Sequence, residues 1–288
     1  MRDFEFLEPA SVAEASRMLA DLGDSCRVFA GGTALMLGMR QRMLTPSHLV
    51  SLGRLEDLRR IGFDPRGGLR IGALALHADV ARSPVVQAHY PMLASMASRV
   101  ANPQVRNQGT IGGNLCYADP ATDPPGCLMA LGAQIVVSGT GGERVIGIED
   151  FLVDYYVTAL AGDEVVTEIR LPPPAAGADG LYSRFLRTAA EHRPLASVAL
   201  SVRRERAFCV DVRLAVGAST PIPARLRRAE ALLAGKTVTA ELAAEAADIV
   251  AADINAVSDL RGSASYRREM VRVVARRTIS GLFGVASE

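Results

Sequence analysis

The N-terminal part of the chain alternates between helical and extended patterns of apolar residues. Between residues 11 and 22 the apolar positions recur at helical spacing, behind a serine that can cap the first turn. A short apolar run at 27–30 ends in paired glycines, and another apolar run follows at 49–52. This order predicts a helix, a strand, a glycine-rich turn, a further helix ending near residue 42, and a second strand.

The middle of the chain predicts a second region, in which strands surround a glycine-rich loop segment at 109–126. Apolar runs and alternation predict strands at 69–73, 133–138 and 164–171, and helical spacing predicts a helix at about 91–100. Three consecutive prolines at 172–174, followed by small residues, predict a domain boundary. We therefore expect one domain at 1–176, with subdomains at about 1–58 and 59–176, and another at 177–288.

The C-terminal part predicts strands first and helices afterwards. Apolar alternation predicts strands at 195–202 and 208–217, separated by a charged turn. Helical spacing follows at about 224–233, 240–254 and 263–283. Strands grouped before helices favour a small α+β domain, with an antiparallel sheet plus helices, over a wound parallel sheet.

Composition narrows the classes of protein that the chain can belong to. The 288 residues are 49% hydrophobic and 22% charged, enough to bury the cores of about two domains. The 32 basic and 31 acidic residues give a net charge of +1, which argues against nucleic-acid binding through a large basic surface. The start lacks the pattern of a secretory signal, and no apolar run approaches the roughly 20 residues that span a bilayer. We expect a cytoplasmic protein without a membrane span.

Cysteine and histidine positions give no sign of a metal site. Four cysteines are scattered without a C-x-x-C pair, so the sequence encodes neither a zinc site nor an iron–sulfur cluster. His77 is a candidate acid or base, but a lone histidine is more often a hydrogen-bonded structural residue. His192 lies in Glu-His-Arg-Pro at 191–194, which suits a solvated turn better than a contact with a cofactor or a partner. We expect no catalytic residue and no metal ligand in this chain.

The first informative motif is Ala-Gly-Gly-Thr-Ala-Leu-Met at 30–36, where the predicted strand turns into the next element. Adjacent glycines permit positive φ and bring no Cβ, so consecutive backbone N–H groups can converge on an anion such as a pyrophosphate. Thr33 can add a hydroxyl donor. The motif lacks the third glycine of G-x-G-x-x-G and the G-K-[ST] end of a P-loop, which disfavours both of those nucleotide folds.

The second motif extends from Asn107 to Asp123 and contains three glycines within five positions, at 109, 112 and 113. Its glycines, the apolar Ile111 and the amide of Asn114 suit a loop wrapped against a polar cofactor. Asp123 can accept hydrogen bonds from a ribose diol, as acidic residues do in other dinucleotide sites. A purely structural glycine loop would not need this collection of donors and acceptors.

Together the two motifs resemble the FAD-binding loops of the medium, flavin subunits of the molybdenum hydroxylases, such as carbon monoxide and xanthine dehydrogenases. The resemblance covers almost the whole chain, with further matches at 162–169, 221–225, 229–230 and 261–268. It implies an α+β fold: a two-subdomain FAD-binding fold of the vanillyl-alcohol oxidase type, followed by a small α+β C-terminal domain. Leu186 and Arg187 stand where some relatives have a lysine near the flavin, which leaves the tuning of the flavin open.

The resemblance also implies the residues that contact FAD. The first loop would bind the pyrophosphate, and the second would bind pyrophosphate, ribityl and ribose groups. Val100 and Ala101 match a position near the adenine or the loop entrance, and Leu160 matches a segment close to the flavin ring. The implied cofactor-binding residues are Ala30, Gly31, Gly32, Thr33, Ala34, Leu35, Val100, Ala101, Gly109, Thr110, Ile111, Gly112, Gly113, Asn114, Asp123 and Leu160.

By the same resemblance, the chain carries FAD and passes electrons onward, while the substrate is oxidised on another polypeptide. A small subunit would hold [2Fe–2S] clusters and a large subunit the molybdopterin cofactor, in a dimer of heterotrimers. The external electron acceptor stays open among NAD, a quinone, oxygen and other carriers. Two alternatives also stay open: a stand-alone FAD-dependent oxidase or dehydrogenase for a small organic substrate, and a scaffold that has lost its cofactor.

Overall fold

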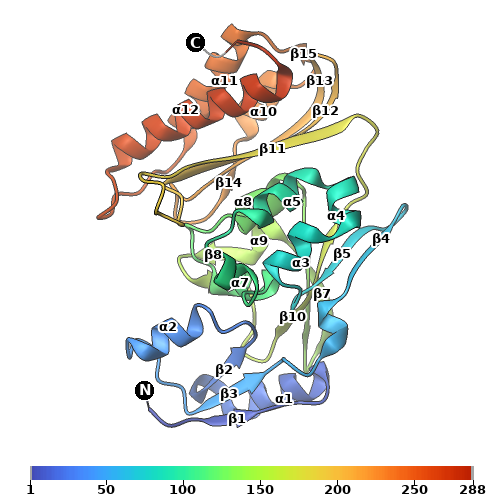
Figure 1. Ribbon diagram of the computed structural model, residues 1–288, viewed down its shortest axis with the longest axis vertical. Helices are drawn as coiled ribbons and strands as arrows, with labels where there is room; N and C mark the ends of the chain where they lie inside the picture. Colours follow the sequence, from blue (N-terminus) through green and yellow to red (C-terminus); the bar gives the residue numbers. More distant parts are fainter. Residues whose placement is uncertain (1, 287–288) are drawn as a thin grey trace.

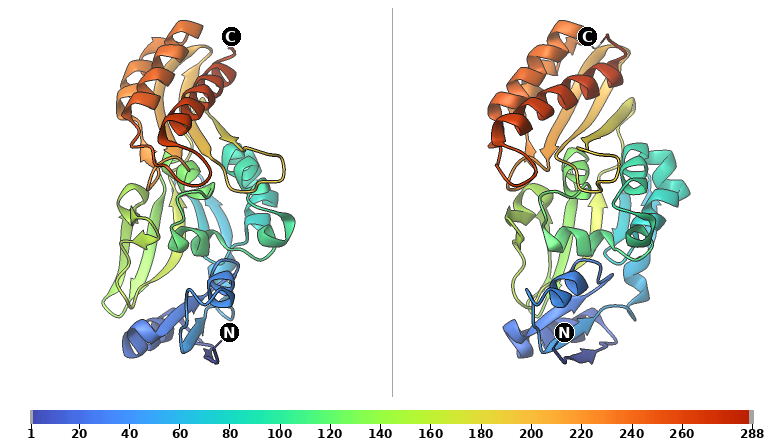
Figure 2. Two further views of the ribbon diagram at one scale, coloured as in Figure 1. Left: turned by 90° about the vertical axis from the view of Figure 1, so that its left-hand side faces the viewer. Right: turned by 60° about the vertical axis from the view of Figure 1, so that its left-hand side comes forward.

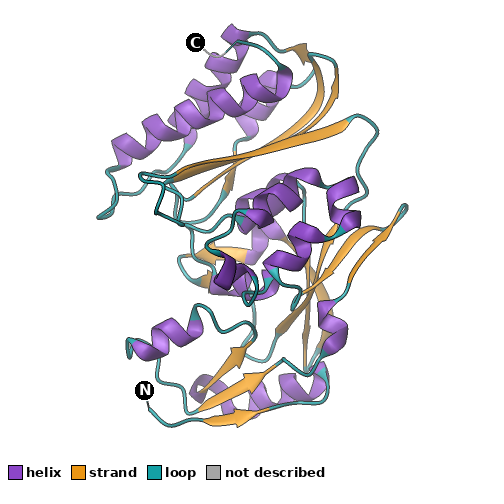
Figure 3. Cartoon of the chain, in the orientation of Figure 1, coloured by secondary structure: helices purple, strands orange, loops and turns teal. Residues whose placement is uncertain are grey.

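The computed structural model describes residues 2–286, which form three layers stacked along the long axis of the molecule (Figure 1). A small N-terminal sheet lies at one end, a larger sheet with its helices lies in the middle, and the C-terminal helices lie at the other end. The view coloured by secondary structure shows strands and helices in each layer (Figure 3). No helix among residues 2–286 has the length and apolar character needed to cross a membrane.

The first layer is a three-stranded parallel sheet in the order β1-β3-β2. Helix α1 packs beside it through Ala15 and Leu19, and the Ser11 hydroxyl caps this helix by accepting a hydrogen bond from Glu14 N at 3.1 Å. These contacts confirm the predicted amphipathic helix. The elements of this layer are β1 (Glu5–Leu7), α1 (Val12–Leu22), β2 (Cys26–Phe29), α2 (Leu35–Arg40) and β3 (His48–Ser51).

The second layer is a five-stranded antiparallel sheet in the order β4-β5-β10-β6-β7. Its buried residues, such as Ile71 and Ile169, form one core with buried residues of the helices, such as Leu93 and Leu128. The strands are β4 (Ile61–Asp64), β5 (Gly68–Gly72), β6 (Gln134–Gly139), β7 (Gly142–Gly147) and β10 (Val165–Leu171), with a separate hairpin of β8 (Leu152–Asp154) and β9 (Val157–Thr158). The helices are α3 (His77–Arg82), α4 (Pro84–His89), α5 (Pro91–Ser98), α6 (Pro103–Arg106), α7 (Ile111–Tyr117), α8 (Pro124–Ala130) and α9 (Ile148–Phe151).

The third layer is an antiparallel sheet covered by helices on its outer face (Figure 2). Alternate residues of its long strands, such as Leu200 and Leu214, share a core with Val250 and Val271 of the helices. The other face of the sheet lies against α5 and α8 of the middle layer. The elements are β11 (Ala178–Phe185), β12 (Ala196–Glu205), β13 (Phe208–Gly217), β14 (Ala224–Arg225), α10 (Arg227–Leu233), β15 (Lys236–Thr237), α11 (Ala240–Asp253) and α12 (Ala264–Phe283).

The structure departs from the sequence-based expectations mainly at glycine-rich and edge segments. Residues 109–126, which we expected to form a loop, contain α7 and the start of α8. The Thr110 side chain caps the first turn of α7, and the helix is held in place by the close packing of Gly112 on Ala73. Strands β4, β7 and β11 were missed, and each of them lies at the edge of its sheet. Residues 224–225, which we predicted as the start of a helix, form a short strand, and the helix begins at Arg227.

Candidate functional site

The first glycine loop, residues 30–34, lies between the end of β2 and the start of α2. Gly32 has a φ of +69°, a backbone conformation that favours glycine, and a Cβ placed there would approach the Phe29 ring to 2.6 Å. The backbone N–H groups of residues 31–34 donate no hydrogen bond to any residue between 2 and 286. Such a row of free donors is suited to an anion.

The second glycine segment forms the N-terminal end of α7. The Thr110 hydroxyl accepts a hydrogen bond from Gly113 N at 3.1 Å. Ile111 N and Gly112 N donate to Ala75 O and Ala73 O at 3.0 and 2.9 Å, so both amides are already used. Both residues are also buried. The structure uses Ile111 and Gly112 to hold α7 on the end of β5, and contact between them and a cofactor stays a prediction.

The two glycine segments are in direct contact, although they are about eighty residues apart in sequence. A Cβ placed on Gly31 would lie 2.2 Å from Gln108 O and 2.9 Å from Gly109 Cα. Behind them, a Cβ on Gly109 would lie 3.4 Å from Thr33 Oγ1. Only glycine permits this approach, because the obstacle at Gly31 is backbone rather than a side chain that can rotate away. The structure therefore brings both predicted loops to one place.

Asn114 supplies a polar group that the protein does not satisfy. Its side-chain oxygen Oδ1 is buried and has no hydrogen-bond partner within residues 2–286. A buried amide oxygen without a donor is unfavourable, so a bound molecule that donates a hydrogen bond to it would be stabilised. The free amides of residues 31–34 and this orphaned acceptor fit a polar dinucleotide. Across the described residues, no cluster of three or more His, Cys, Asp or Glu side chains is placed to hold a metal ion.

His77 lies beneath the second segment and is held neutral by its surroundings. The side chain is 2% exposed, its backbone N–H donates to Gly109 O at 3.1 Å, and its ring atom Nδ1 is buried without a partner. Burial, with a smaller contribution from the nearby Arg106 guanidinium, lowers the pKa of His77 to about 4. An imidazole of this kind supports the loop and does not exchange protons near neutral pH.

The lowered pKa of His77 predicts a specific loss of stability in acid. The unfolded chain binds a proton at His77 below pH 6.5 but the folded chain does so only near pH 4, so stability decreases as the pH falls through this window. Between pH 7 and pH 5 we expect the wild-type free energy of unfolding to decrease by about 2 kcal/mol more than that of His77→Asn. Urea unfolding at both pH values measures this difference. The exposed His192→Asn control should behave like the wild type, and an equal pH response in His77→Asn would contradict the explanation.

Val100, Ala101 and Leu160 lie near the glycine segments but belong to other elements. Val100 is buried, Ala101 has a φ of +42°, and Arg106 Nη1 donates to the carbonyl oxygens of both at 2.9 and 3.2 Å. They form the turn between α5 and α6 that leads into the second segment. Leu160 is partly buried against the main core, just after β9, and β9 contacts α7. Their roles beside a cofactor stay predictions.

Asp123 joins the middle layer to the C-terminal sheet. It is 3% exposed and accepts hydrogen bonds from Tyr182 Oη at 2.6 Å and from Arg184 Nη1 at 3.0 Å. Burial raises the pKa of Asp123 above its ordinary value, although Arg184 and Tyr182 act in the opposite direction. Both carboxylate oxygens already have protein partners, so a ribose would have to share them, and that contact stays a prediction.

Segment 186–195 connects β11 to β12 and passes beside the second motif. One arginine of this segment fixes it to that motif. Arg193 forms an ion pair with Asp119, which lies two residues after α7 and is buried. The expectation of a solvated turn at 191–194 missed this contact. The sequence gives little indication of this ion pair, because Arg193 and Asp119 lie 74 residues apart and no local pattern links them.

Comparison of the chain with known proteins shows which family it belongs to. Residues 2–174 match the model of the FAD binding domain in molybdopterin dehydrogenase, and residues 182–282 match the CO dehydrogenase flavoprotein C-terminal domain. The carbon monoxide dehydrogenase medium chain of Hydrogenophaga pseudoflava is 34% identical over 96% of both chains. The nicotine 6-hydroxylase medium subunit of Paenarthrobacter nicotinovorans is 35% identical over 95% of both.

Solved structures agree with this assignment over nearly the full length. A chain of the H. pseudoflava carbon monoxide dehydrogenase superimposes with a TM-score of 0.94 at 35% identity, covering 98% of each chain. Quinoline 2-oxidoreductase from Pseudomonas putida 86 gives 0.92 at 29% identity, also over 98% of each. These likenesses confirm the expected α+β fold with an FAD-binding domain and a smaller C-terminal domain. The chain belongs to the family of FAD-binding medium subunits of the molybdopterin-dependent dehydrogenases.

Proposed function

We propose that this chain is the electron-transferring flavin subunit of a heteromeric molybdenum hydroxylase. The observation that carries the proposal is the contact between the two glycine segments, where the free N–H groups of residues 31–34 lie beside the capped end of α7. The relatives are named as medium chains or subunits. Such names do not favour a stand-alone oxidase.

The residues of the site have separate tasks in holding FAD. The backbone amides of residues 31–34 would bind the pyrophosphate, with Thr33 as a further donor. Asn114 Oδ1, which has no protein partner, would accept a hydrogen bond from the ribityl or ribose part. Bound FAD supplies the redox chemistry, because a flavin can accept single electrons and release one or two. The chain itself would orient the cofactor, and the neutral His77 supports the loops from below.

The chain would act within a complex. A small subunit would supply electrons from [2Fe–2S] clusters, and a large subunit would oxidise the substrate at the molybdopterin cofactor. A dimer of heterotrimers and a cytoplasmic location complete the proposal. Four cysteines, three of them buried, support the placement of the clusters on a partner, since cluster ligation needs several convergent thiolates. Iron, molybdenum and flavin analysis of the complex purified through a tag on this chain tests the proposal, and the absence of flavin would overturn it.

Asn114→Ala tests the site without disturbing the fold. Because Asn114 Oδ1 makes no hydrogen bond within the described chain, its removal takes away no internal bond. We expect the Kd for FAD to rise about tenfold, which corresponds to one lost hydrogen bond of about 1.4 kcal/mol, while the unfolding midpoint of the apoprotein does not decrease. Fluorescence titration of the apoprotein with FAD measures the change. Asn107→Ala, an exposed asparagine of the same motif, is the matched control and should bind FAD as the wild type does.

A further inference from the structure

A cavity of about 250 Å³ lies between the middle layer and the C-terminal sheet, where the chain passes from one to the other. The α4–α5 turn, the end of α8 and the three prolines at 172–174 form one wall, and strands β11, β12 and β13 form the other. Figure 1 shows α4 and α5 beneath β11. We call this space the linker cavity, and it is lined by residues other than those predicted to contact FAD.

Small residues on the sheet and apolar residues on the helices shape the linker cavity. Tyr90 and Met92, each 4% exposed, line it from the helical side. Gly180 lines it from β11, where a Cβ would lie 3.1 Å from Met92 Sδ. The Tyr90 hydroxyl donates to Pro172 O at 2.7 Å, which fixes the linker to the α4–α5 turn. The protein therefore builds an apolar wall at a defined place.

Arg203 and Arg213 line the cavity from neighbouring strands. On these strands Ala199 and Ala215 belong to the core of the middle layer, and every second residue faces the same way. Arg203 lies directly opposite Asp211, two residues before Arg213. The two arginines are thus diagonal neighbours about 7–8 Å apart, within reach of one ligand for side chains of this length.

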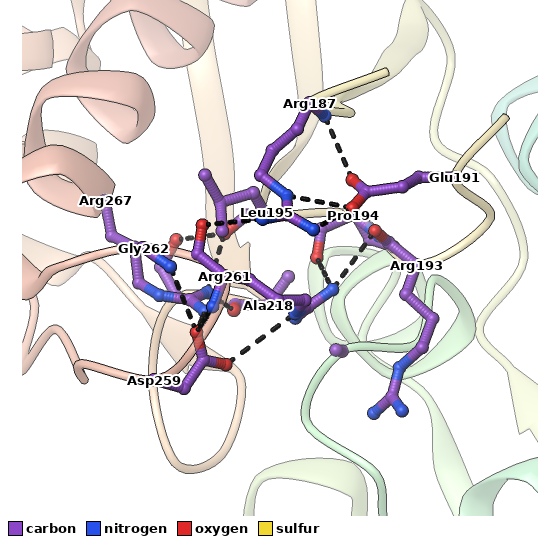
Figure 4. Close-up of polar contacts among 12 residues, drawn as sticks. Arg187, Glu191, Arg193, Pro194, Leu195, Ala218, Asp259, Arg261, Gly262 and Arg267 are labelled. Atoms are coloured by element: carbon purple, nitrogen blue, oxygen red, sulfur yellow. Dashed lines mark hydrogen bonds and ion pairs between the residues drawn. The ribbon is translucent and has the colours of Figure 1, made fainter. Parts of the chain in front are cut away.

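Neither of these guanidinium groups has a protein partner. Within residues 2–286, the side chains of Arg203 and Arg213 form no hydrogen bond and no ion pair. Arginines at the other end of the sheet differ in this respect. Figure 4 shows Arg187, Arg261 and Arg267 donating to carboxylates or to backbone carbonyl oxygens. The unpaired guanidinium groups are therefore a local property of the linker cavity.

The guanidinium of Arg213 extends from the sheet to the middle layer. A Cβ placed on Gly132, just after α8, would lie 1.8 Å from Arg213 Nη1. The absence of a side chain at Gly132 leaves room for the guanidinium there. Packing of the two layers, rather than a hydrogen bond, thus places the charged group at the cavity.

The charged side chains around the linker cavity leave one positive charge unbalanced. Asp179 pairs with Arg204 at 2.7 Å, so this pair is neutral. Asp211 lies opposite Arg203 and offsets its charge. Arg213 is then left without a counter-charge, and because it is only partly exposed, solvent screens it incompletely.

An arginine beside an apolar wall has the chemistry of a carboxylate site. A guanidinium can donate two parallel N–H bonds to a carboxylate, and an apolar lining suits the rest of the molecule. One unbalanced charge matches a monoanion better than a phosphate monoester, which carries about −1.5 to −2 at pH 7. The volume lies below the roughly 300 Å³ at which pockets for drug-sized ligands begin. We propose that the linker cavity binds a small monocarboxylate with an apolar body, independently of FAD.

The test uses fluorine NMR of the full-length chain with 4-fluorobenzoate as the probe. We expect saturable broadening of the probe signal with a Kd of about 1 mM. The uncharged 4-fluorobenzamide and the smaller acetate, followed by competition with the probe, should bind at least about tenfold more weakly. Bound 4-fluorobenzoate should also raise the unfolding midpoint, because the occupant contacts both layers of the folded chain.

Arginine variants locate the probe. Arg213→Gln should raise the Kd at least about tenfold, and Arg203→Gln, at a more exposed residue, about threefold. Arg206→Gln removes the same charge from the exposed β12–β13 turn and should bind the probe as the wild type does. All three variants should keep the wild-type flavin content and unfolding midpoint in the absence of the probe.

Three results would overturn the linker cavity as a carboxylate site. The first is no saturable binding of 4-fluorobenzoate, and the second is equal binding of the benzamide or of acetate. The third is binding that Arg213→Gln retains and Gly31→Ala abolishes, which would assign the probe to the free amides of residues 31–34. A chain that binds the probe but no flavin would overturn the proposed function alone.

Discussion

Gly31→Ala should reduce the FAD content of the purified protein at least about tenfold. One added methyl group would lie 2.2 Å from Gln108 O, far inside van der Waals contact, and no side-chain rotation relieves a clash with backbone. The two glycine segments must then separate. Separation moves the free amides of residues 31–34 away from Thr110 and Asn114, so the two halves of the site no longer bind one cofactor. The ratio of flavin to protein absorbance measures the effect.

Gly126→Ala is the matched control for this experiment. Gly126 lies in α8, three residues after Asp123, and a Cβ placed on it meets no atom within 4 Å. The control therefore adds the same methyl group near the same site without a clash, and it should retain a wild-type flavin ratio. A Gly31→Ala protein with full flavin would show that close contact of the two segments is unnecessary for binding.

Arg267→Ala should lower the free energy of unfolding of the C-terminal domain by about 3 kcal/mol. The side chain of Arg267 is fully buried, so its removal leaves a cavity and takes the hydrogen-bond donor from the buried carbonyl of Ala218. It also releases Asp259, which holds the turn at 259–262 through Arg261 N and Gly262 N. Urea unfolding followed by circular dichroism measures the change.

The neighbouring Arg268 gives a direct comparison, because it lies on the same helix and is exposed. Arg268→Ala changes helix propensity and net charge in the same way, and surface substitutions of this kind shift the free energy by about 0.5 kcal/mol or less. A similar loss in both variants would assign the effect to α12 in general. A large loss in Arg267→Ala alone would assign it to the buried contacts.

The parts of the fold that the sequence predicts are those in which local pattern and burial agree. α1 has a capping serine and a regular apolar face, and β13 has Val210, Val212, Leu214 and Val216 at every second position, so both follow from residue order. β4 and β7 lie at sheet edges; β4 has only four residues and β7 has a single buried residue, so the apolar pattern is too short to mark either as a strand. The helix α7 was not predicted, because three glycines in five positions give a low helix propensity that one capping threonine does not offset. The close packing of Gly112 on Ala73, which no local pattern reveals, decides the structure.

The candidate site shows the same division. The glycines of both motifs are visible in the sequence because a close approach of backbones requires that residue type. The pairing of Gly31 with Gln108 is invisible, since it depends on how the first two layers meet. The partners of Asp119 and Asp123 lie in the C-terminal part, at Arg193, Tyr182 and Arg184, and nothing local connects them. Contacts between layers therefore account for most of what the sequence did not predict.

Residues 119–123 join the middle layer to the C-terminal sheet. They follow α7 and accept hydrogen bonds from β11 and from the segment before β12. Free energies around a closed thermodynamic cycle sum to zero. If bound FAD stabilises the conformation of this stretch that contacts the C-terminal sheet, then contact with the sheet strengthens FAD binding by the same free energy. FAD binding and the docking of that sheet would then be coupled, and substitutions at Tyr182 or Arg184 would change the affinity for FAD.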